Sequence, residues 1–281
     1  MFSRILSTLV LWTTVLGSLW FCGSHAAVAL VTVLSALTLH EFYGMTRKMG
    51  LKPFGWMGLG FSVVMTAGPF YLAYFTDDAA LGDGLTSGLL VLALIISCFR
   101  VLAERDAATR IEALAATVGG LLFVPFMLQF LVRILMRDAD SGDNLVLCLW
   151  VVAVSKCCDM GALLTGLAIG RHKLAPNISP KKTWEGAFGG VLTSGAVGAA
   201  IAYFAPAYLP ASLTPTAAAL VALPLAVITI ISDLMESALK RRADVKDTGA
   251  IIPGIGGAFD LTDSLILTAP VAYFIFFILD V

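Results

Sequence analysis

The sequence predicts an all-α, polytopic membrane protein. Three observations support this: 59% of the 281 residues are hydrophobic and only 13% are charged, and the mean hydropathy is +0.92. Soluble domains carry roughly 25% charged residues. Helices are the expected spanning elements, because a helix satisfies its own backbone hydrogen bonds where water is absent. The formal net charge of -1 gives no reason to expect a nucleic-acid partner.

Nine apolar runs approach the length of roughly 20 residues that a helix needs to cross a bilayer. They are residues 5–22, 26–42, 54–75, 85–103, 114–136, 145–169, 186–206, 216–235 and 264–280. An alternative interpretation of the first run is a cleaved signal peptide, because Arg4 precedes it and small residues follow near Ala26. We expect a single integral membrane domain, 1–281, with N-terminal spans in about 1–115 and the polar motifs in about 145–281.

The basic residues predict the orientation of the spans. Fifteen of the 18 Lys and Arg residues lie in segments that share one side of the membrane if nine spans are retained. Arg133 and Arg137 fall on the other side, and Lys156 falls within a span. The positive-inside rule therefore predicts a cytoplasmic N-terminus, an outer C-terminus and retention of the first span in a cytoplasmic membrane.

Two places in the spans carry ionisable residues. His40 and Glu41 end the second run, where we interpret them as a polar pair at a helix end near the interface. Lys156 and Asp159 lie deep in the sixth run at i and i+3, so they share a helix face. Ionisable groups inside a span usually face the bundle interior or a polar cavity. The two residues either neutralise each other or form the wall of a site that contacts substrate or metal.

The segment 170–186, GRHKLAPNISPKKTWEG, follows the sixth run. Pro176 and Pro180 exclude a continuous helix and favour extended or turn conformations. Thr183 is expected to cap the next helix, and Lys181 and Lys182 beside that helix N-terminus form an anion site. The alternative is a basic patch that touches acidic lipid headgroups.

The segment 237–264 concentrates charge in an apolar chain. It contains Lys240, Arg241, Arg242, Lys246, Asp244, Asp247, Asp260 and Asp263, together with glycines at 249, 254, 256 and 257. If a helix begins near Ala258, Asp260 and Asp263 share one face, and the glycines let Asp247 fold toward them. Carboxylates beside cations suit a magnesium and phosphate site. The alternative for KRRADVKD is a surface helix with alternating charges.

At these residues the chain resembles the phosphatidate cytidylyltransferase (CDP-diacylglycerol synthase) family. Its signature S-x-x-K-R-x-x-x-x-K-D, with a later P-G-H-G-G-x-x-D-R-x-D, is matched at Ser237, Lys240, Arg241, Lys246, Asp247, Pro253, Gly254, Gly256, Gly257, Asp260 and Asp263. Asp159, Gly161, Ala162 and the segment 170–186 match a second family segment. The chain departs at Ile255, where the family has His, and at Leu261, where it has Arg.

The resemblance implies transfer of CMP from CTP to phosphatidic acid, with release of pyrophosphate and without a covalent intermediate. It implies Mg²⁺, with room for a second cation, held by Asp247, Asp260 and Asp263 and with Asp159 as a further contributor. Lys246 joins these three aspartates as a catalytic residue. The substrate-binding set comprises Ser179, Lys181, Lys182, Ser237, Lys240 and Arg241. Membrane lipids are expected around the protein, and the family resemblance is compatible with a homodimer.

Three other functions remain open from the sequence. A CTP-dependent polyprenol or lipid kinase would attack the γ-phosphorus and release CDP. A degenerate relative is the alternative that the departures at Ile255 and Leu261 leave open, although every acidic and lysine position of the signature is retained. A transporter would explain Lys156 and Asp159, but not the charged segment 237–264, and the paired interrupted spans of many transporters are missing. No Walker A sequence occurs, which argues against a P-loop enzyme.

Overall fold

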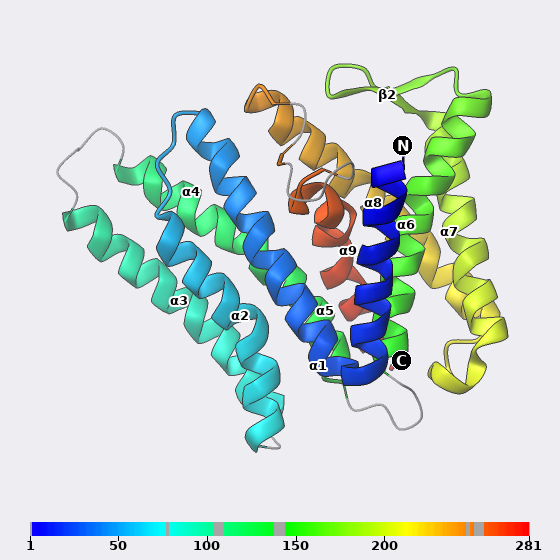
Figure 1. Cartoon of the computed structure of the whole chain (residues 1–281), viewed down its shortest axis with the longest axis horizontal. Coiled ribbons are helices and arrows are strands. Elements are labelled where there is room, and N and C mark those ends of the chain that lie inside the picture. Colours follow the sequence, from blue (N-terminus) through cyan, green and yellow to red (C-terminus); the bar gives the residue numbers. More distant parts are fainter. Residues whose placement is uncertain are drawn as a thin grey trace. The chain divides into compact units, whose positions relative to one another are not determined.

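The computed structural model describes residues 2–76, 79–103, 110–137, 144–245, 248–249 and 256–280 (Figure 1), with side chains described from Thr13 onward except at 79, 80, 83 and 110. The elements are α1 (Phe2–Lys48), α2 (Gly55–Thr76), α3 (Ala79–Ala103), α4 (Arg110–Phe123), α5 (Pro125–Leu135), α6 (Asn144–Ile169), β1 (Lys173–Ala175), β2 (Ser179–Thr183), α7 (Trp184–Phe204), the 3-10 helix η2 (Pro206–Tyr208), α8 (Pro215–Arg242) and α9 (Ala258–Leu279).

The helices confirm the all-α membrane class. Over the described ranges, eight helical segments are long and apolar enough to cross a membrane, against nine predicted. The difference arises in α1, which contains both predicted runs 5–22 and 26–42 without a loop between them. Gly23, with φ 54° and ψ -132°, breaks the helical geometry there. Only glycine adopts a positive φ at little cost, so this residue divides α1 into two pieces.

The predicted span 114–136 is also divided. It consists of α4 and α5, and together they supply one apolar segment, Ile111–Leu135. Val124 separates the two helices, and Pro125 begins the second. Proline suits the first position of a helix because its missing N–H has no intrahelical acceptor there.

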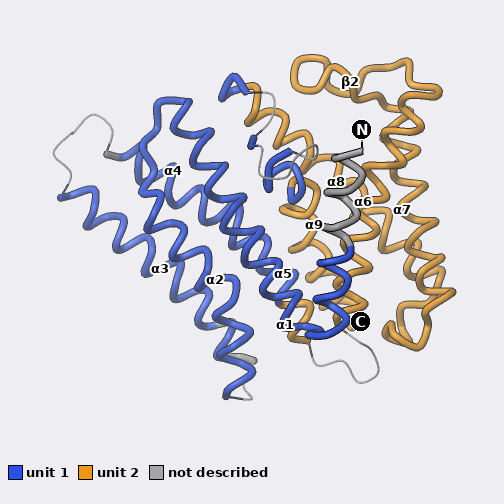
Figure 2. The backbone as a smooth tube through the Cα atoms, in the orientation of Figure 1, with its two compact units in different colours: residues 1–132, 242–262 blue, residues 133–241, 263–281 orange. Residues whose placement is uncertain are grey.

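The chain forms two compact units, which Figure 2 colours separately. The first unit comprises Met1–Val132 and Arg242–Thr262, and α1, α2, α3 and α4 pack together within it. Tyr43 is fully buried in its core, and its hydroxyl donates a hydrogen bond to the carbonyl of Thr117 at 2.9 Å. Gly58 and Gly120 make room for the ring, because a Cβ would lie 2.4 Å and 2.5 Å from its atoms.

The second unit comprises Arg133–Arg241 and Asp263–Val281, and α6 packs closely on α7 within it. Small residues allow this approach, as is common between membrane helices. A Cβ on Gly190 would lie 2.7 Å from the carbonyl oxygen of Cys158. Farther along, the indole N–H of Trp150 donates to the carbonyl of Gly198 at 3.1 Å. This pair of helices is the support for the polar groups described below.

We expect Gly190→Ala to destabilise the protein by about 1–3 kcal/mol, because its methyl group would press on backbone atoms of α6 that have no room to move. Gly60→Ala in α2 is the matched control, since a Cβ there meets nothing within 4 Å. Thermal unfolding in detergent measures both. Equal midpoints for the two variants would show that the contact between α6 and α7 is not tightly packed.

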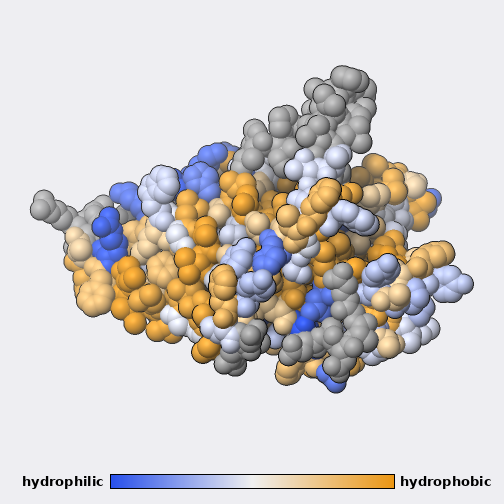
Figure 3. Space-filling model, turned by 60° about the horizontal axis from the view of Figure 1, so that its bottom comes forward, coloured by the Kyte–Doolittle hydropathy of each residue, from blue (hydrophilic) through white to orange (hydrophobic). Residues whose placement is uncertain are grey.

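The outer surface of the helices is strongly apolar. Among the exposed side chains, Trp20 is 86% exposed, Trp56 91% and Leu167 77%. The face shown in Figure 3 carries broad areas of apolar side chains between smaller polar areas. Patches of this extent are rare on soluble monomers. With eight spanning segments, they identify an integral membrane protein whose apolar surface faces lipid.

Candidate functional site

The segment 170–186 forms a short hairpin that is fixed to the start of α7. β1 and β2 pair antiparallel, so the two prolines exclude helix as predicted. The Thr183 hydroxyl accepts a hydrogen bond from the backbone N–H of Gly186 at 3.1 Å, which confirms the predicted cap. Glu185 accepts from the backbone N–H groups of Arg171 at 3.0 Å and His172 at 3.2 Å. These bonds hold both ends of the hairpin against α7.

A pocket of about 600 Å³ lies between α6, the hairpin, α7 and α8, all in the second unit. Its charged lining residues come from α6, β1, β2 and α8, and its apolar lining residues come mainly from α6. They include Asp159, Lys173, Lys181, Lys182 and Asp233, with Leu163, Leu167 and Ile230. A pocket lined by three lysines, two aspartates and several aliphatic side chains suits an anionic headgroup that carries an apolar tail.

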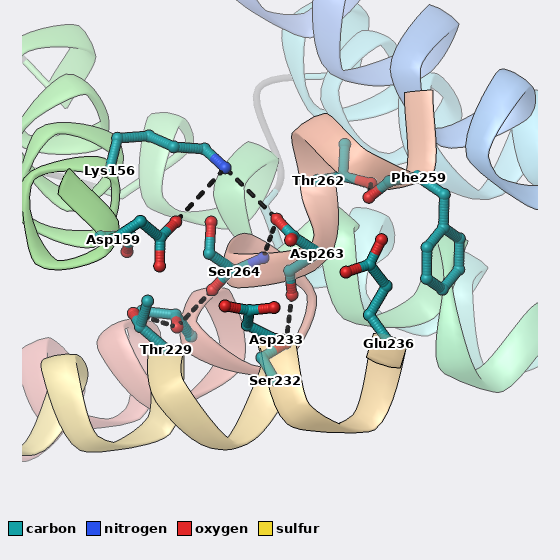
Figure 4. Close-up of polar contacts among 12 residues, drawn as sticks. Lys156, Asp159, Thr229, Ser232, Asp233, Glu236, Phe259, Thr262, Asp263 and Ser264 are labelled. Carbon is teal, nitrogen blue, oxygen red and sulfur yellow. Dashed lines mark hydrogen bonds and ion pairs between the residues drawn. The ribbon is translucent and has the colours of Figure 1, made fainter. Parts of the chain in front are cut away.

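Three carboxylates meet beside this pocket. Asp233 and Glu236 lie on α8, and Asp263 lies on α9 (Figure 4). One oxygen from each lies within 4.8 Å of the others. Asp233 and Glu236 stand at i and i+3, so the helix itself turns them to one side. Carboxylate oxygens are hard ligands of the kind that Mg²⁺ prefers, and their spacing fits a small cation bound among them.

Each of these carboxylates is paired with its own lysine, and the three lysines come from three different elements. Asp263 lies 3.4 Å from Lys156 Nζ of α6, Asp233 is paired with Lys182 of the hairpin, and Glu236 with Lys240 one helical turn along α8. Carboxylates this close repel one another, and the lysines offset that repulsion.

Lys156 links the cluster to α6, because its Nζ also lies 3.7 Å from Asp159 Oδ2. The sequence left open whether Lys156 and Asp159 only neutralise each other. The structure joins the pair to Asp263 as well, and Asp159 lines the pocket. The pair is therefore part of a larger charged cluster in the second unit.

Uncharged groups hold α8 against this part of α9. The Ser232 hydroxyl of α8 donates to the carbonyl of Asp263 on α9. Within α9, the Asp263 carboxylate accepts from the backbone N–H of Ser264 at 2.6 Å. About one turn away along both helices, the hydroxyls of Thr229 and Thr268 are 3.0 Å apart. Groups fixed in this way change position little during a reaction, which favours electrostatic stabilisation.

The structure places the other predicted residues around and outside this cluster. Arg241 Nε lies 3.4 Å from the carbonyl of Ile178 at the hairpin, Ser179 begins β2, and Ser237 lies half-buried on α8. Asp260 lies in the first turn of α9 and accepts from the backbone N–H of Gly257 at 2.8 Å. Lys246, Asp247 and Ile255 lie outside the described residues, and Leu261 is half-buried in α9.

The sequence reasoning overlooked Asp233 and Glu236. The available signal was that Asp233 lies inside the predicted run 216–235, where an acid is costly, with Glu236 three residues later.

The interpretation of Glu41 as a residue at a helix end was wrong. α1 continues to Lys48, and Glu41 is only 6% exposed. Phe42, Tyr43, Met45 and Thr46 beyond it are also buried, so the polar pair does not end the helix.

Fold and site together define an integral membrane protein with an acidic, lysine-paired cluster suited to phosphate chemistry. The chain belongs to the Cytidylyltransferase family, whose model matches residues 2–279, and this confirms the resemblance seen in the sequence. It is 30% identical to a phosphatidate cytidylyltransferase of Synechocystis sp. over 283 residues, covering 92% of this chain and 89% of that protein.

Two further relatives carry the same name. The phosphatidate cytidylyltransferase of Thermotoga maritima is 33% identical over 206 residues, which cover 69% of this chain and 71% of the relative. That of Rickettsia felis is 38% identical over 163 residues, which cover 56% of this chain and 68% of the relative.

Proposed function

We propose that this protein transfers CMP from CTP to phosphatidic acid, giving CDP-diacylglycerol and pyrophosphate. The observation that carries the proposal is the cluster of Asp233, Glu236 and Asp263, each paired with a lysine, beside a pocket lined by both lysines and aliphatic side chains. Family membership and the names of the relatives support the same reaction.

In this reaction a phosphate oxygen of the lipid attacks the α-phosphorus of CTP. A new P–O bond forms to the lipid phosphate, the bond between the α-phosphorus and its bridging oxygen breaks, and pyrophosphate leaves with that electron pair. The lipid phosphate is already an anionic nucleophile, so the protein needs no covalent intermediate. Its contribution is to position two anions and offset their charge.

The donor set fits Mg²⁺, because Asp233, Glu236 and Asp263 offer three hard oxygen atoms within 4.8 Å of one another. Asp260 and Asp159 remain further proposed ligands, and the chemistry leaves room for a second cation. Asp233, Glu236 and Asp263 would hold the ion, which would supply positive charge to offset the negative charge of the leaving pyrophosphate.

The lysines would exchange partners when substrates bind. Lys182 and Lys156 are held near the pocket by carboxylates, so their ammonium groups are already in place for phosphate oxygens. Lys181 lines the same pocket. Arg241 and Lys240 extend the basic surface along α8. We assign them to the triphosphate of CTP, because it carries more negative charge than the lipid phosphate.

We also propose that the site faces the cytoplasm, with the N-terminus on the same side. The support is the distribution of Lys and Arg along the sequence, which places the hairpin and the end of α8 on the positive side. A site at that face meets soluble CTP and bilayer lipid together.

Two labelled forms of CTP test the reaction. Purified protein in liposomes with phosphatidic acid and Mg²⁺ receives CTP labelled at either the α- or the γ-phosphate. Label from the α-position is expected in the lipid and label from the γ-position in pyrophosphate. The lipid kinase predicts the reverse, with γ-label in the lipid and α-label in CDP, and that result would refute the proposal.

A further inference from the structure

A carboxylate from α1 binds the start of α9, entirely within the first unit. Glu41 Oε1 accepts a hydrogen bond from the backbone N–H of Ala258 at 3.0 Å. Its Oε2 accepts from the backbone N–H of Phe259 and from the hydroxyl of Thr248, both at 2.9 Å. Both oxygens are therefore engaged, in a side chain that is nearly buried.

This arrangement meets the needs of a helix N-terminus. The first N–H groups of a helix have no partner within it, and the helix dipole makes this end attractive to an anion. The residue just before a helix usually supplies the acceptor. Here the acceptor comes from 217 residues earlier in the chain.

The glycines near α9 leave room for this carboxylate. A Cβ on Gly249 would lie 2.3 Å from Glu41 Oε1, and a Cβ on Gly257 would lie 2.3 Å from Glu41 Oε2. Gly256, at φ +119°, makes the turn that lets Gly257 N–H reach Asp260 Oδ2. Two of the glycines that mark this segment in the sequence, Gly249 and Gly257, therefore lie against a side chain of α1.

We propose that Glu41 is a positioning residue for the acids of α9. It fixes the first turn of the helix, which carries Asp260, and so sets the direction in which Asp263 emerges one turn later. Phe259 supports the same turn by packing between Phe42 and Phe123, with ring centroids 6.4 Å from each. The role of the two acids in binding a divalent cation rests on the proposed function, and Glu41 acts only through them.

The test compares Glu41→Gln with Thr38→Val. Glutamine keeps the shape but lowers the acceptor strength and turns an NH₂ donor toward groups that also donate. Thr38→Val is the matched control, because it removes another buried contact between α1 and α9, the 2.9 Å pair of Thr38 and Thr262 hydroxyls. Thr262 keeps the carbonyl of Ala258 as an acceptor in that variant.

Hydrogen exchange of the first turn of α9 and Mg²⁺ titration of CMP transfer are the two readouts. In Glu41→Gln we expect the exchange rate of this turn and the half-saturating Mg²⁺ concentration each to rise about tenfold or more, because the loss of a hydrogen bond to a charged group has an effect of this size. The kcat at saturating Mg²⁺ should stay within about threefold of wild type. Thr38→Val is expected to change neither.

Two results would overturn the proposal: unchanged exchange in Glu41→Gln, or an unchanged Mg²⁺ requirement with a loss of thermal stability equal to that of Thr38→Val. If the wild type transfers no CMP, the proposed function fails by itself. Mn²⁺ binding by electron paramagnetic resonance then decides about Glu41. Weaker binding by Glu41→Gln than by Thr38→Val supports positioning, and equal binding refutes it.

Discussion

Asp263→Asn is expected to lower kcat for CMP transfer on the order of a hundredfold or more, because removing one preorganised charged group from a reacting centre costs about that much. Asparagine keeps the acceptor for the N–H of Ser264 and leaves the backbone bond from Ser232 intact. The fold should therefore persist. The change removes one negative charge from the cluster and one of the two carboxylates beside Lys156.

Turnover of purified protein, with thermal unfolding in parallel, measures this effect. Glu112→Gln is the matched control, since it makes the same acid-to-amide change at an exposed position of α4. The control should keep wild-type turnover. Near-normal turnover of Asp263→Asn would remove this carboxylate from the chemistry.

Lys182→Met is expected to lower kcat/KM about a hundredfold, because it takes an ammonium group from the phosphate side of the pocket. It should also destabilise the fold by about 1–3 kcal/mol. Breaking a fully buried ion pair would cost more, but the side chains of Lys182 and Asp233 are 25% and 26% exposed. The stability loss arises because Asp233 keeps its charge without this cation.

The double variant Lys182→Met with Asp233→Asn separates structure from chemistry. Stability should return, because the charge that lost its partner is gone. Turnover should stay low, because in our account Lys182 contacts the phosphates and Asp233 is a ligand of the metal. Lys48→Met, at the exposed end of α1, controls for loss of a lysine. Recovery of turnover in the double variant would mean that the ion pair is only structural.

The sequence predicted the local features of this protein well. The start of α9 near Ala258, the Thr183 cap, the non-helical segment at the two prolines and the shared helix face of Lys156 and Asp159 all depend on residues close in the chain. Eight segments are counted against nine predicted runs because α1 holds the first two runs, and Gly23 divides it without an intervening loop.

The long-range features could not be predicted in the same way. Asp233 and Asp263 meet because α8 and α9 lie side by side in the second unit, held by Thr229 and Thr268. Glu41 meets α9 through contacts more than 200 residues apart in the chain. Spacing within a helix reveals which residues share a face, but not which other helix that face contacts.

A change of metal preference tests the central claim that the acidic cluster binds the metal used in catalysis. Asp263→Cys replaces a hard oxygen ligand by a soft thiolate, so turnover should fall with Mg²⁺ and return in part with Cd²⁺. Two controls show whether Cd²⁺ acts through other thiols. The first is the wild-type protein with Cd²⁺, because Cys22 and Cys98 are exposed in the described part of the chain, and the second is Glu112→Cys. Recovery in Asp263→Cys alone is the predicted result. Absence of any change in metal preference, in a folded variant with measurable residual turnover, would contradict the account.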